Sequence, residues 1–364
     1  MLSSGATRTG NRWRGLADKS RRVGAIALAV VALAGGAGAA GLSTRIPAPR
    51  DGAWTPVADT GAVRLPAPPG VYAQKIGADE RGVYIFTLDK LSGSAPVVLF
   101  LHGGCGTDPY LYAGWIDHIV RNGSVVIFPV FAKSGCDTRT PVDTVERNIV
   151  DGTQAAIALL QKEGQVQPDA NRFAIVGHSF GGGLSAQIAA QAQQFGLPVP
   201  RFVMPVMPGW RNNKDYPIQN VANIPSSVYL LVVEGDKDQF EGTRYGLQIF
   251  RTARQIPLRQ RAYVQLHSQQ RDGRKFLADH FAPLSPDPRY RYEQKRSRPL
   301  MNLLMSMSDV REGETDDLDV DGFWRLFDNS SGASFRRGCD MGCSLQQAGG
   351  KGAIDWTVDE SDSQ

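Results

Sequence analysis

Residues 172–187 read RFAIVGHSFGGGLSAQ, and this stretch decides the fold. The apolar run at 173–176 is typical of a buried strand, and the small residues after 180 are typical of a closely packed helix. Between them, Ser179 has glycine two residues to either side, at Gly177 and Gly181. A sharp strand-to-helix turn strains its central residue and excludes side chains at the flanking positions. The stretch therefore predicts a turn that lifts the Ser179 hydroxyl above a sheet edge, where it can act as a nucleophile.

Apolar runs alternate with helical patterns along the rest of the chain. Strands are expected at 71–76, 83–88, 97–101, 125–130, 172–176, 202–206, 228–233 and 262–266. Helices are expected near 110–121, 142–163, 180–195 and 241–254. This alternation predicts an α/β fold, with a mainly parallel central sheet and helices on both faces. In such sheets, ligands bind beyond the carboxyl ends of the strands.

The basic charge of the chain belongs to its first 50 residues. They hold eight Lys and Arg and one acidic residue, so the totals of 40 and 36 fall to 32 basic and 35 acidic residues in the remainder. Nothing in this distribution indicates a nucleic-acid partner. An uncharged, mostly apolar stretch at 23–44 follows the basic flank, as in an export signal. Cleavage and membrane anchoring both stay open, and either places the catalytic part outside the cytoplasm.

The composition divides the chain into four parts. Residues 1–42 are expected to be a signal peptide or N-terminal membrane anchor, and 43–70 a proline-rich linker. Residues 71–330 are expected to form one large α/β domain, which a chain with 42% hydrophobic residues can fill. Residues 331–364 are expected to be a polar, cysteine-containing tail on the surface.

Four cysteines fit an exported protein, because disulfides persist outside the cytoplasm. Cys339 and Cys343 are four residues apart and can close a small loop. Cys105 and Cys136 each follow an expected strand and can meet across neighbouring strand ends. Two disulfides are therefore predicted, and a four-cysteine zinc site is the competing interpretation.

The strand at 97–101 leads into a glycine-rich turn, in the sequence LFLHGGCG at 99–106. Such a turn exposes backbone N–H groups toward a serine on the neighbouring strand. We expect the N–H groups of Gly104 and Phe180 to form an oxyanion hole, which stabilises charge on the attacked carbonyl oxygen.

The sequence LLVVEGDKDQFEG at 230–242 places two acids just after a buried strand. A carboxylate there can hold an imidazole in the correct tautomer and stabilise its charged form. Asp238 is the preferred acid. Asp236 lies closer to the strand and is the competitor, although capping of the turn explains it equally well.

The order of Ser179, Asp238 and a late histidine resembles that of the α/β-hydrolase family over about residues 70–330. Residues 97–106 look like its oxyanion turn, 177–181 its nucleophile elbow and 235–238 its acid loop. The short linkers look most like the dienelactone hydrolase, chlorophyllase and polyester hydrolase branch. The oxyanion turn departs from the family pattern in having Cys105 in place of a third glycine. The resemblance implies hydrolysis of esters or related acyl compounds.

Five histidines compete for the role of base: His102, His118, His178, His267 and His280. His102 lies in the oxyanion turn, His118 in a helix expected to pack on the sheet, and His178 beside the serine on a turn where neighbouring side chains diverge. His267 ends a strand, which limits its approach to Ser179. His280 follows a charged loop long enough to fold back over the strand ends. The family places its base in a loop after the last strand, which favours His280 over His267.

Three aromatic residues near the same edge are candidates for a substrate pocket: Tyr110, Tyr112 and Trp210. Ordinary packing explains each of them almost as well. The sequence DLDVDGFWRLFD at 317–328 matches the start of a calcium loop, but its last position is Asp328 rather than glutamate, and Arg325 stands near the ion. A helix with an acidic first turn is the preferred interpretation.

These observations predict an exported serine hydrolase that cleaves a carboxylic ester through an acyl-enzyme. The mechanism requires no metal and no organic cofactor. The expected partner is a small-molecule, lipid or polymer ester, with membrane attachment through the N-terminal segment as an open alternative, and the oligomeric state is open. An acyltransferase of the cell envelope and a catalytically silent binding protein of the same fold are the alternatives.

Overall fold

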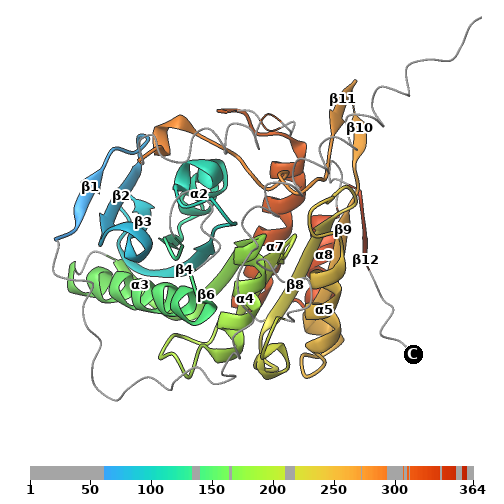
Figure 1. Cartoon of the computed structure of the whole chain (residues 1–364), viewed down its shortest axis with the longest axis horizontal. Helices are drawn as coiled ribbons and strands as arrows, with labels where there is room; N and C mark the ends of the chain where they lie inside the picture. The colour runs from blue at the N-terminus through green and yellow to red at the C-terminus, as the bar shows by residue number, and fades with distance from the viewer. Residues whose placement is uncertain are drawn as a thin grey trace, which may run out of the picture. The chain divides into compact units, whose positions relative to one another are not determined.

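A ten-stranded sheet runs through the described residues in the order β1-β2-β3-β5-β4-β6-β7-β8-β9-β12 (Figure 1). The computed structural model describes residues 61–132, 140–163, 166–209, 218–271, 273–292, 306, 310, 312–336, 338–349 and 355–358. The strands are β1 (Val63–Leu65), β2 (Val71–Ile76), β3 (Val83–Leu88), β4 (Gly93–Leu101), β5 (Val125–Pro129), β6 (Val166–His178), β7 (Phe202–Val206), β8 (Tyr229–Gly235), β9 (Arg261–Leu266) and β12 (Trp356–Val358). The six strands from β5 to β9 in this order pair in parallel, whereas β1, β2, β3 and β12 pair antiparallel.

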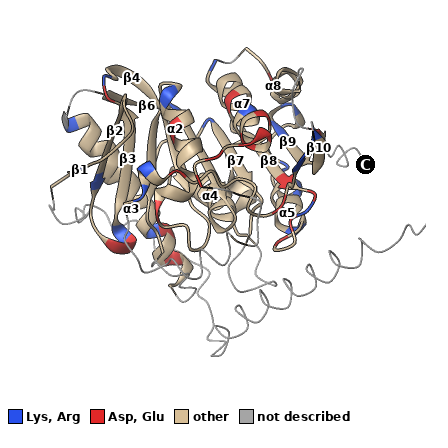
Figure 2. Ribbon diagram, turned by 90° about the horizontal axis from the view of Figure 1, so that it is seen from above, with Lys and Arg blue, Asp and Glu red and all other residues tan. Residues whose placement is uncertain are grey.

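Helices cover both faces of this sheet, which confirms the predicted α/β-hydrolase architecture. One face packs against α2 (Ala113–Arg121), α7 (Arg325–Arg336), α8 (Met341–Ala348) and the π-helical turn η6 (Leu318–Trp324). The other face packs against α3 (Val142–Glu163), α4 (Phe180–Gln191) and α5 (Arg244–Thr252). Figure 2 shows α7 and α8 on one side of the strands and α5 on the other.

The helices follow from the spacing of their apolar residues. In α3, Val145, Ile149, Ala156 and Leu160 recur at helical spacing, and all four are buried against the sheet. The bounds of β2, β3, β7 and α3 coincide with those predicted, while β6 begins earlier than expected and α4 and α5 are shorter.

The sheet begins before the predicted domain boundary at residue 71. Val63 of β1 lies opposite Lys75 of β2, so residues that were assigned to the linker 43–70 form an edge strand. Pro66 is also tied to the domain, because its carbonyl accepts a 2.9 Å hydrogen bond from the Tyr292 hydroxyl. No described helix is long and apolar enough to span a bilayer, and the stretch at 23–44 lies outside the described residues.

The C-terminal part is more structured than the predicted polar tail at 331–364. Helix α7 runs across residue 331, α8 follows it, and β12 pairs with β9. Serines take the place of larger apolar residues in these helices. Ser334 and Ser344 are buried, and their hydroxyls donate 2.7 Å and 2.9 Å hydrogen bonds to backbone carbonyls one turn earlier. Small, internally satisfied residues let these helices pack closely, although they give little apolar signal in the sequence.

The predicted disulfide between Cys339 and Cys343 is present at the start of α8. Cys105 is also disulfide-bonded, and its expected partner Cys136 lies outside the described residues. Asp340 caps α8, since its side chain accepts a 2.9 Å hydrogen bond from the backbone N–H of Cys343.

Residues 317–328 form a helix, as preferred over a calcium loop. Asp321 pairs with Arg325 within this segment, and Asp328 contacts His118 at 2.7 Å. His118 also stacks on Trp324, with ring centroids 4.8 Å apart. Helix α2 packs on the sheet as expected, whereas the His118 side chain itself contacts η6 and α7.

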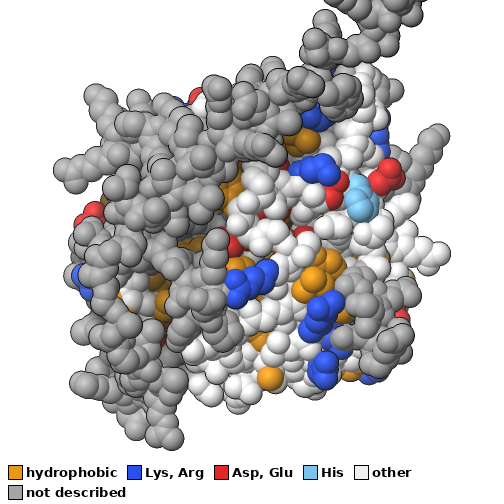
Figure 3. Space-filling model, turned by 45° about the vertical axis from the view of Figure 1, so that its right-hand side comes forward, with side chains coloured by type: hydrophobic (Ala, Val, Ile, Leu, Met, Phe, Trp, Pro, Cys, Tyr) orange, Lys and Arg blue, Asp and Glu red, His pale blue; other side chains and the backbone are white. Residues whose placement is uncertain are grey.

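Large apolar side chains are exposed at few described positions: Val63, Leu258, Val320 and Val358. Val63 and Val358 lie on the two edge strands of the sheet. On the face seen in Figure 3, apolar side chains are scattered and lie among Lys and Arg side chains.

Candidate active site

The turn between β6 and α4 has the strained geometry that the sequence predicts. Ser179 has φ +56° and ψ −123°, a backbone conformation that L-residues rarely adopt. A Cβ atom on Gly177 would lie 2.1 Å from the Gly181 carbonyl oxygen. A Cβ atom on Gly181 would lie 2.2 Å from the carbonyl oxygen of Leu101, at the end of β4. Both glycines are therefore required by close approach of backbone to backbone.

Strained residues gather at the carboxyl edge of the sheet. Three of the five described non-glycine residues with positive φ follow β4, β6 and β7 directly or closely: Cys105 at +71°, Ser179 at +56° and Met207 at +42°. Strain of this kind persists only where the surrounding structure imposes it, and it is often found at functional sites.

Ser179, His280 and Asp238 form a hydrogen-bonded row at this edge. His280 Nε2 lies 2.9 Å from the Ser179 hydroxyl oxygen, and His280 Nδ1 lies 2.7 Å from Asp238 Oδ2. The other carboxylate oxygen of Asp238 accepts hydrogen bonds from the backbone N–H groups of Phe240 and Glu241, at 2.9 Å and 3.1 Å. The acid is thereby fixed on one side and holds the imidazole on the other.

The pKa values of His280 and Asp238 shift in opposite directions because the two groups stabilise each other's charged form. Burial disfavours the charged form of His280, but the charge and hydrogen bond of Asp238 outweigh it and raise the pKa of His280. Burial also opposes ionisation of Asp238, but His280 and two backbone N–H groups outweigh it and lower the pKa of Asp238. Asp238 therefore stabilises a proton on His280.

His280 reaches the site through a hairpin that follows β9. The hairpin consists of β10 (Gln269–Arg271) and β11 (Arg274–Phe276). After it, the chain returns to the acid loop, where the Ala278 carbonyl accepts a 3.0 Å hydrogen bond from the N–H of Lys237. The charged loop expected to fold back over the strand ends does so.

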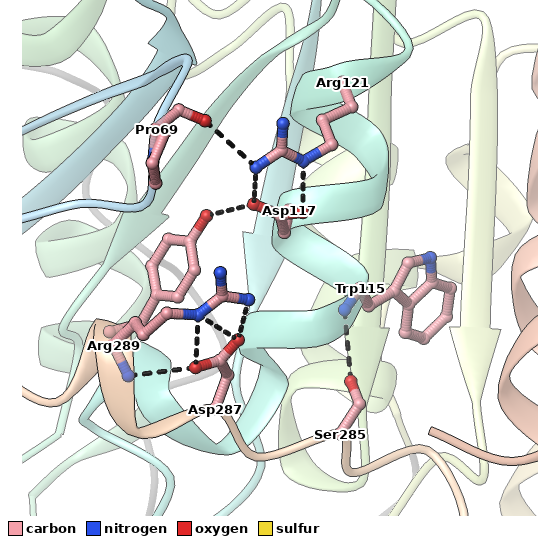
Figure 4. Close-up of polar contacts among 8 residues, drawn as sticks. Pro69, Trp115, Asp117, Arg121, Ser285, Asp287 and Arg289 are labelled. Atoms are coloured by element: carbon pink, nitrogen blue, oxygen red, sulfur yellow. Dashed lines mark hydrogen bonds and ion pairs between the residues drawn. The ribbon is translucent and has the colours of Figure 1, made fainter. Parts of the chain in front are cut away.

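The loop after His280 is tied to η2 (Pro109–Tyr112) and α2, which follow the oxyanion turn. The Ser285 carbonyl accepts a 2.8 Å hydrogen bond from Gly114 N–H, and the Ser285 hydroxyl accepts one of 3.1 Å from Trp115 N–H. Further along, the Tyr290 hydroxyl donates to Asp117 at 2.6 Å, and Asp117 also pairs with Arg121 (Figure 4). The loop after His280 is thus anchored to the two helices that follow the oxyanion turn.

The turn at 103–106 adjoins the serine. A Cβ atom on Gly103 would lie 3.2 Å from the Cβ atom of Ser179, and the Gly106 N–H closes the turn on the Gly103 carbonyl at 3.0 Å. The space over Gly104 is open, because a Cβ atom there would meet nothing within 4 Å. Phe180 begins α4 directly after the serine. Both predicted oxyanion donors therefore lie on segments that border Ser179.

The three predicted pocket residues differ in their burial and contacts. Tyr112 is 1% exposed and packs on Phe100, with ring centroids 5.1 Å apart, so the pocket prediction was wrong for it. Tyr110 is half-buried; its hydroxyl donates to Glu312 at 2.7 Å, and the Arg291 guanidinium lies 4.0 Å from its ring centroid. Trp210 lies outside the described residues.

The competing residues have other partners. His267 contacts the Thr357 hydroxyl at 3.2 Å on the edge strand β12. Asp236 accepts hydrogen bonds from the backbone and hydroxyl of Ser268, at 2.9 Å and 2.6 Å, and so caps the turn. His102 is fully buried, stacks on Phe131 with ring centroids 3.9 Å apart, and donates to the Gly103 carbonyl.

Two residues near the base were not found from the sequence. The Phe240 ring lies 5.2 Å from the His280 ring, and Glu241 raises the pKa of His280 further. A Cβ atom on Gly209 would lie 2.7 Å from the Glu241 carboxyl carbon, while the Gly209 N–H donates to the Ser179 carbonyl at 2.9 Å. The only sequence signal for Phe240 and Glu241 was their position two and three residues after Asp238.

Among the described residues, no group of three or more His, Cys, Asp and Glu side chains is arranged to hold a metal ion.

Residues 72–205 match the chlorophyllase family model, a span that includes Ser179 and the oxyanion turn but neither Asp238 nor His280. A mutant of the esterase rPPE in complex with (S)-Ac-CPA is similar, with TM-score 0.42 and 17% identity over 54% of this chain and 73% of that chain. A double mutant of the same esterase is similar with a TM-score of 0.41 and 17% sequence identity. That match covers 62% of this chain and 75% of the esterase chain. A search of the curated proteins found no match.

The sheet topology is that of an α/β-hydrolase fold, and the match to the chlorophyllase family model covers 134 of the 364 residues. Its chlorophyllase-like part runs from β2 to β7.

Proposed function

We propose that this protein is a serine hydrolase that cleaves carboxylic esters through an acyl-enzyme. The observation that carries the proposal is the row of Ser179, His280 and Asp238, with contacts of 2.9 Å and 2.7 Å. The match of residues 72–205 to the chlorophyllase family supports ester hydrolysis as the reaction class.

The proposed reaction proceeds in two halves. The Ser179 oxygen attacks the ester carbonyl while its proton passes to His280 Nε2, and the oxyanion takes hydrogen bonds from the N–H groups of Gly104 and Phe180. His280 then gives that proton to the departing alcohol, which leaves an acyl group on Ser179. In the second half, water loses a proton to His280 and attacks the acyl group; His280 then gives that proton to the Ser179 oxygen as the carboxylic acid is released.

Asp238 acts on this cycle through His280. It stabilises the imidazolium that forms in both halves, and its hydrogen bond keeps Nε2 directed at the serine. Every step uses groups of the protein and water, so the proposed reaction needs no cofactor.

The test is turnover of chromogenic esters of varied acyl length by wild type, Ser179→Ala, His280→Ala and the control His267→Ala. Removal of Ser179 or His280 should lower turnover by about a millionfold. His267→Ala should stay within about twofold of wild type, because its contact is with Thr357 at the sheet edge. Near-normal turnover by His280→Ala in folded protein would contradict the proposal.

We also propose that the catalytic domain lies outside the cytoplasm. The basic flank and uncharged stretch at 23–44 support export, and the two disulfide-bonded positions at Cys105 and Cys339–Cys343 fit an oxidising compartment. Fusion of residues 1–60 to alkaline phosphatase, which is active only after export, tests this. An active fusion is expected, and an inactive, cytoplasmic fusion would contradict it.

A further inference from the structure

A chain of buried hydrogen bonds crosses the floor of the site beneath Ser179. The Gly103 N–H donates to the Tyr112 hydroxyl at 2.8 Å, and the Tyr112 hydroxyl contacts His178 Nδ1 at 3.0 Å. His178 Nε2 in turn contacts the backbone carbonyl of His280 at 2.8 Å. Tyr112 and His178 are 1% and 4% exposed, so water does not compete for these bonds.

When His178 is neutral, only one arrangement of protons satisfies every one of these hydrogen bonds. A carbonyl can only accept, so His178 Nε2 carries a hydrogen and donates it to the His280 carbonyl. Burial lowers the pKa of His178 to about 3, which keeps the imidazole neutral and leaves Nδ1 as an acceptor. The Tyr112 hydroxyl therefore donates to Nδ1 and accepts from Gly103, and burial raises the pKa of Tyr112 so that it keeps its proton.

The chain connects the two parts of the site that must act on one carbonyl group. Gly103 precedes the proposed oxyanion donor Gly104, and His280 is the proposed base. His178 itself is covalently joined to Ser179. A shift of about 1 Å between such groups can lower the rate a hundredfold.

We propose that His178 and Tyr112 are positioning residues that hold the oxyanion turn and the base in register with the serine. This inference rests on the proposed function. The neutral His178 imidazole is the central link, and it acts by its fixed tautomer rather than by transferring a proton to substrate.

Other contacts keep the loops folded without this chain. The Gly114 N–H donates to the Ser285 carbonyl, and the Tyr290 hydroxyl donates to Asp117. The Trp115 N–H donates to the Ser285 hydroxyl (Figure 4). Loss of the Tyr112 hydroxyl should therefore change the register of the catalytic groups more than the stability of the domain.

The kinetic test compares Tyr112→Phe with Tyr84→Phe. Tyr84 is a matched control, because it is fully buried in the same core cluster, contacts Phe128 as Tyr112 does, and its hydroxyl is hydrogen-bonded to Lys75 at 2.9 Å. We expect Tyr112→Phe to lower kcat roughly 10- to 100-fold with KM within about twofold. Tyr84→Phe should leave both constants near wild type at a similar loss of Tm. A kcat for Tyr112→Phe within twofold of wild type would overturn the proposal.

A second measurement does not depend on activity. Nitrogen NMR of ¹⁵N-histidine-labelled full-length protein, with the His178 signals assigned by their loss in His178→Gln, reports the tautomer. We expect neutral Nε2–H from pH 5 to pH 9. The Nδ1–H tautomer, or titration near pH 6.5, would overturn the proposal. A wild-type protein without ester turnover would instead refute the proposed function, and the NMR result would still decide whether the hydrogen-bond chain exists.

Discussion

Gly181→Ala is expected to damage this protein even though alanine favours helices. Gly181 is the second residue of α4, where a change from glycine to alanine raises helix propensity by at most about 1 kcal/mol. Against this, the new methyl group would lie 2.2 Å from the Leu101 carbonyl oxygen and 2.5 Å from that of His102. Ordinary contact begins at 3.4 Å, so the overlap with Leu101 is 1.2 Å.

The overlap cannot be relieved by a side-chain rotation, because the atoms that clash belong to the backbone. Overpacking costs about 1–3 kcal/mol, and an overlap with two backbone oxygens puts the cost here at about 2–3 kcal/mol, which exceeds the gain in propensity. A net loss of about 1–2 kcal/mol corresponds to a Tm lower by roughly 2–8 °C in a domain near this size. Because Leu101 and His102 lead into the oxyanion turn, relief of the clash should also move that turn away from Ser179, and ester turnover should fall.

The assay is thermal unfolding by circular dichroism, together with ester turnover at 25 °C. Gly338→Ala is the control, since a Cβ atom there meets nothing within 4 Å and it should match wild type in both. A Gly181→Ala protein as stable and as active as wild type would refute the account of the elbow.

Three further outcomes follow from the structure. Asp238→Asn should lower turnover by about 10⁴-fold and move the acid limb of the kcat/KM profile to lower pH, because Asp238 raises the pKa of His280 in wild type; an unmoved limb would count against the pair. Burial raises the pKa of Glu234 well above its usual range, so its contribution to stability is present below about pH 4.5 and is lost as pH rises through the folded pKa. The Tm of Glu234→Gln minus the Tm of wild type should therefore be larger at pH 9 than at pH 5. The same Tm difference at the two pH values would argue against a buried neutral acid. Replacing Cys339 and Cys343 by serine should lower stability by at most about 2 kcal/mol, as expected for a five-residue loop, and leave turnover within twofold.

Much of the fold follows from local patterns in the sequence. Helix α3 has a clear helical period of apolar residues, and β2 and β3 are short segments set off by Gly70, Gly77 and Gly82, so their bounds were predicted correctly. A helix was expected at 317–328, but the rest of α7 and the whole of α8 were missed, because serines such as Ser334 and Ser344 occupy buried positions and interrupt the apolar period. These helices pack against strands that are distant in the sequence, such as β7 and β8, and a local sequence pattern does not reveal such contacts.

The candidate site divides in the same way. The elbow glycines, Asp238 and His280 could be selected because their roles depend on chain order and on position after a strand. The proposed positioning role of Tyr112 could not be predicted from the sequence, since a tyrosine at that position suits a pocket or a core equally well. The proposal depends on the contact of Tyr112 with His178, which is 66 residues away in the sequence.

The central claim is that Ser179 is the activated nucleophile, and covalent labelling tests it most directly. The folded, full-length protein would be treated with a fluorophosphonate probe and analysed by intact mass and peptide mapping. We predict one adduct, on Ser179, with labelling much slowed in His280→Ala and unchanged in His267→Ala. Absence of an adduct on Ser179 in folded wild-type protein would contradict the account.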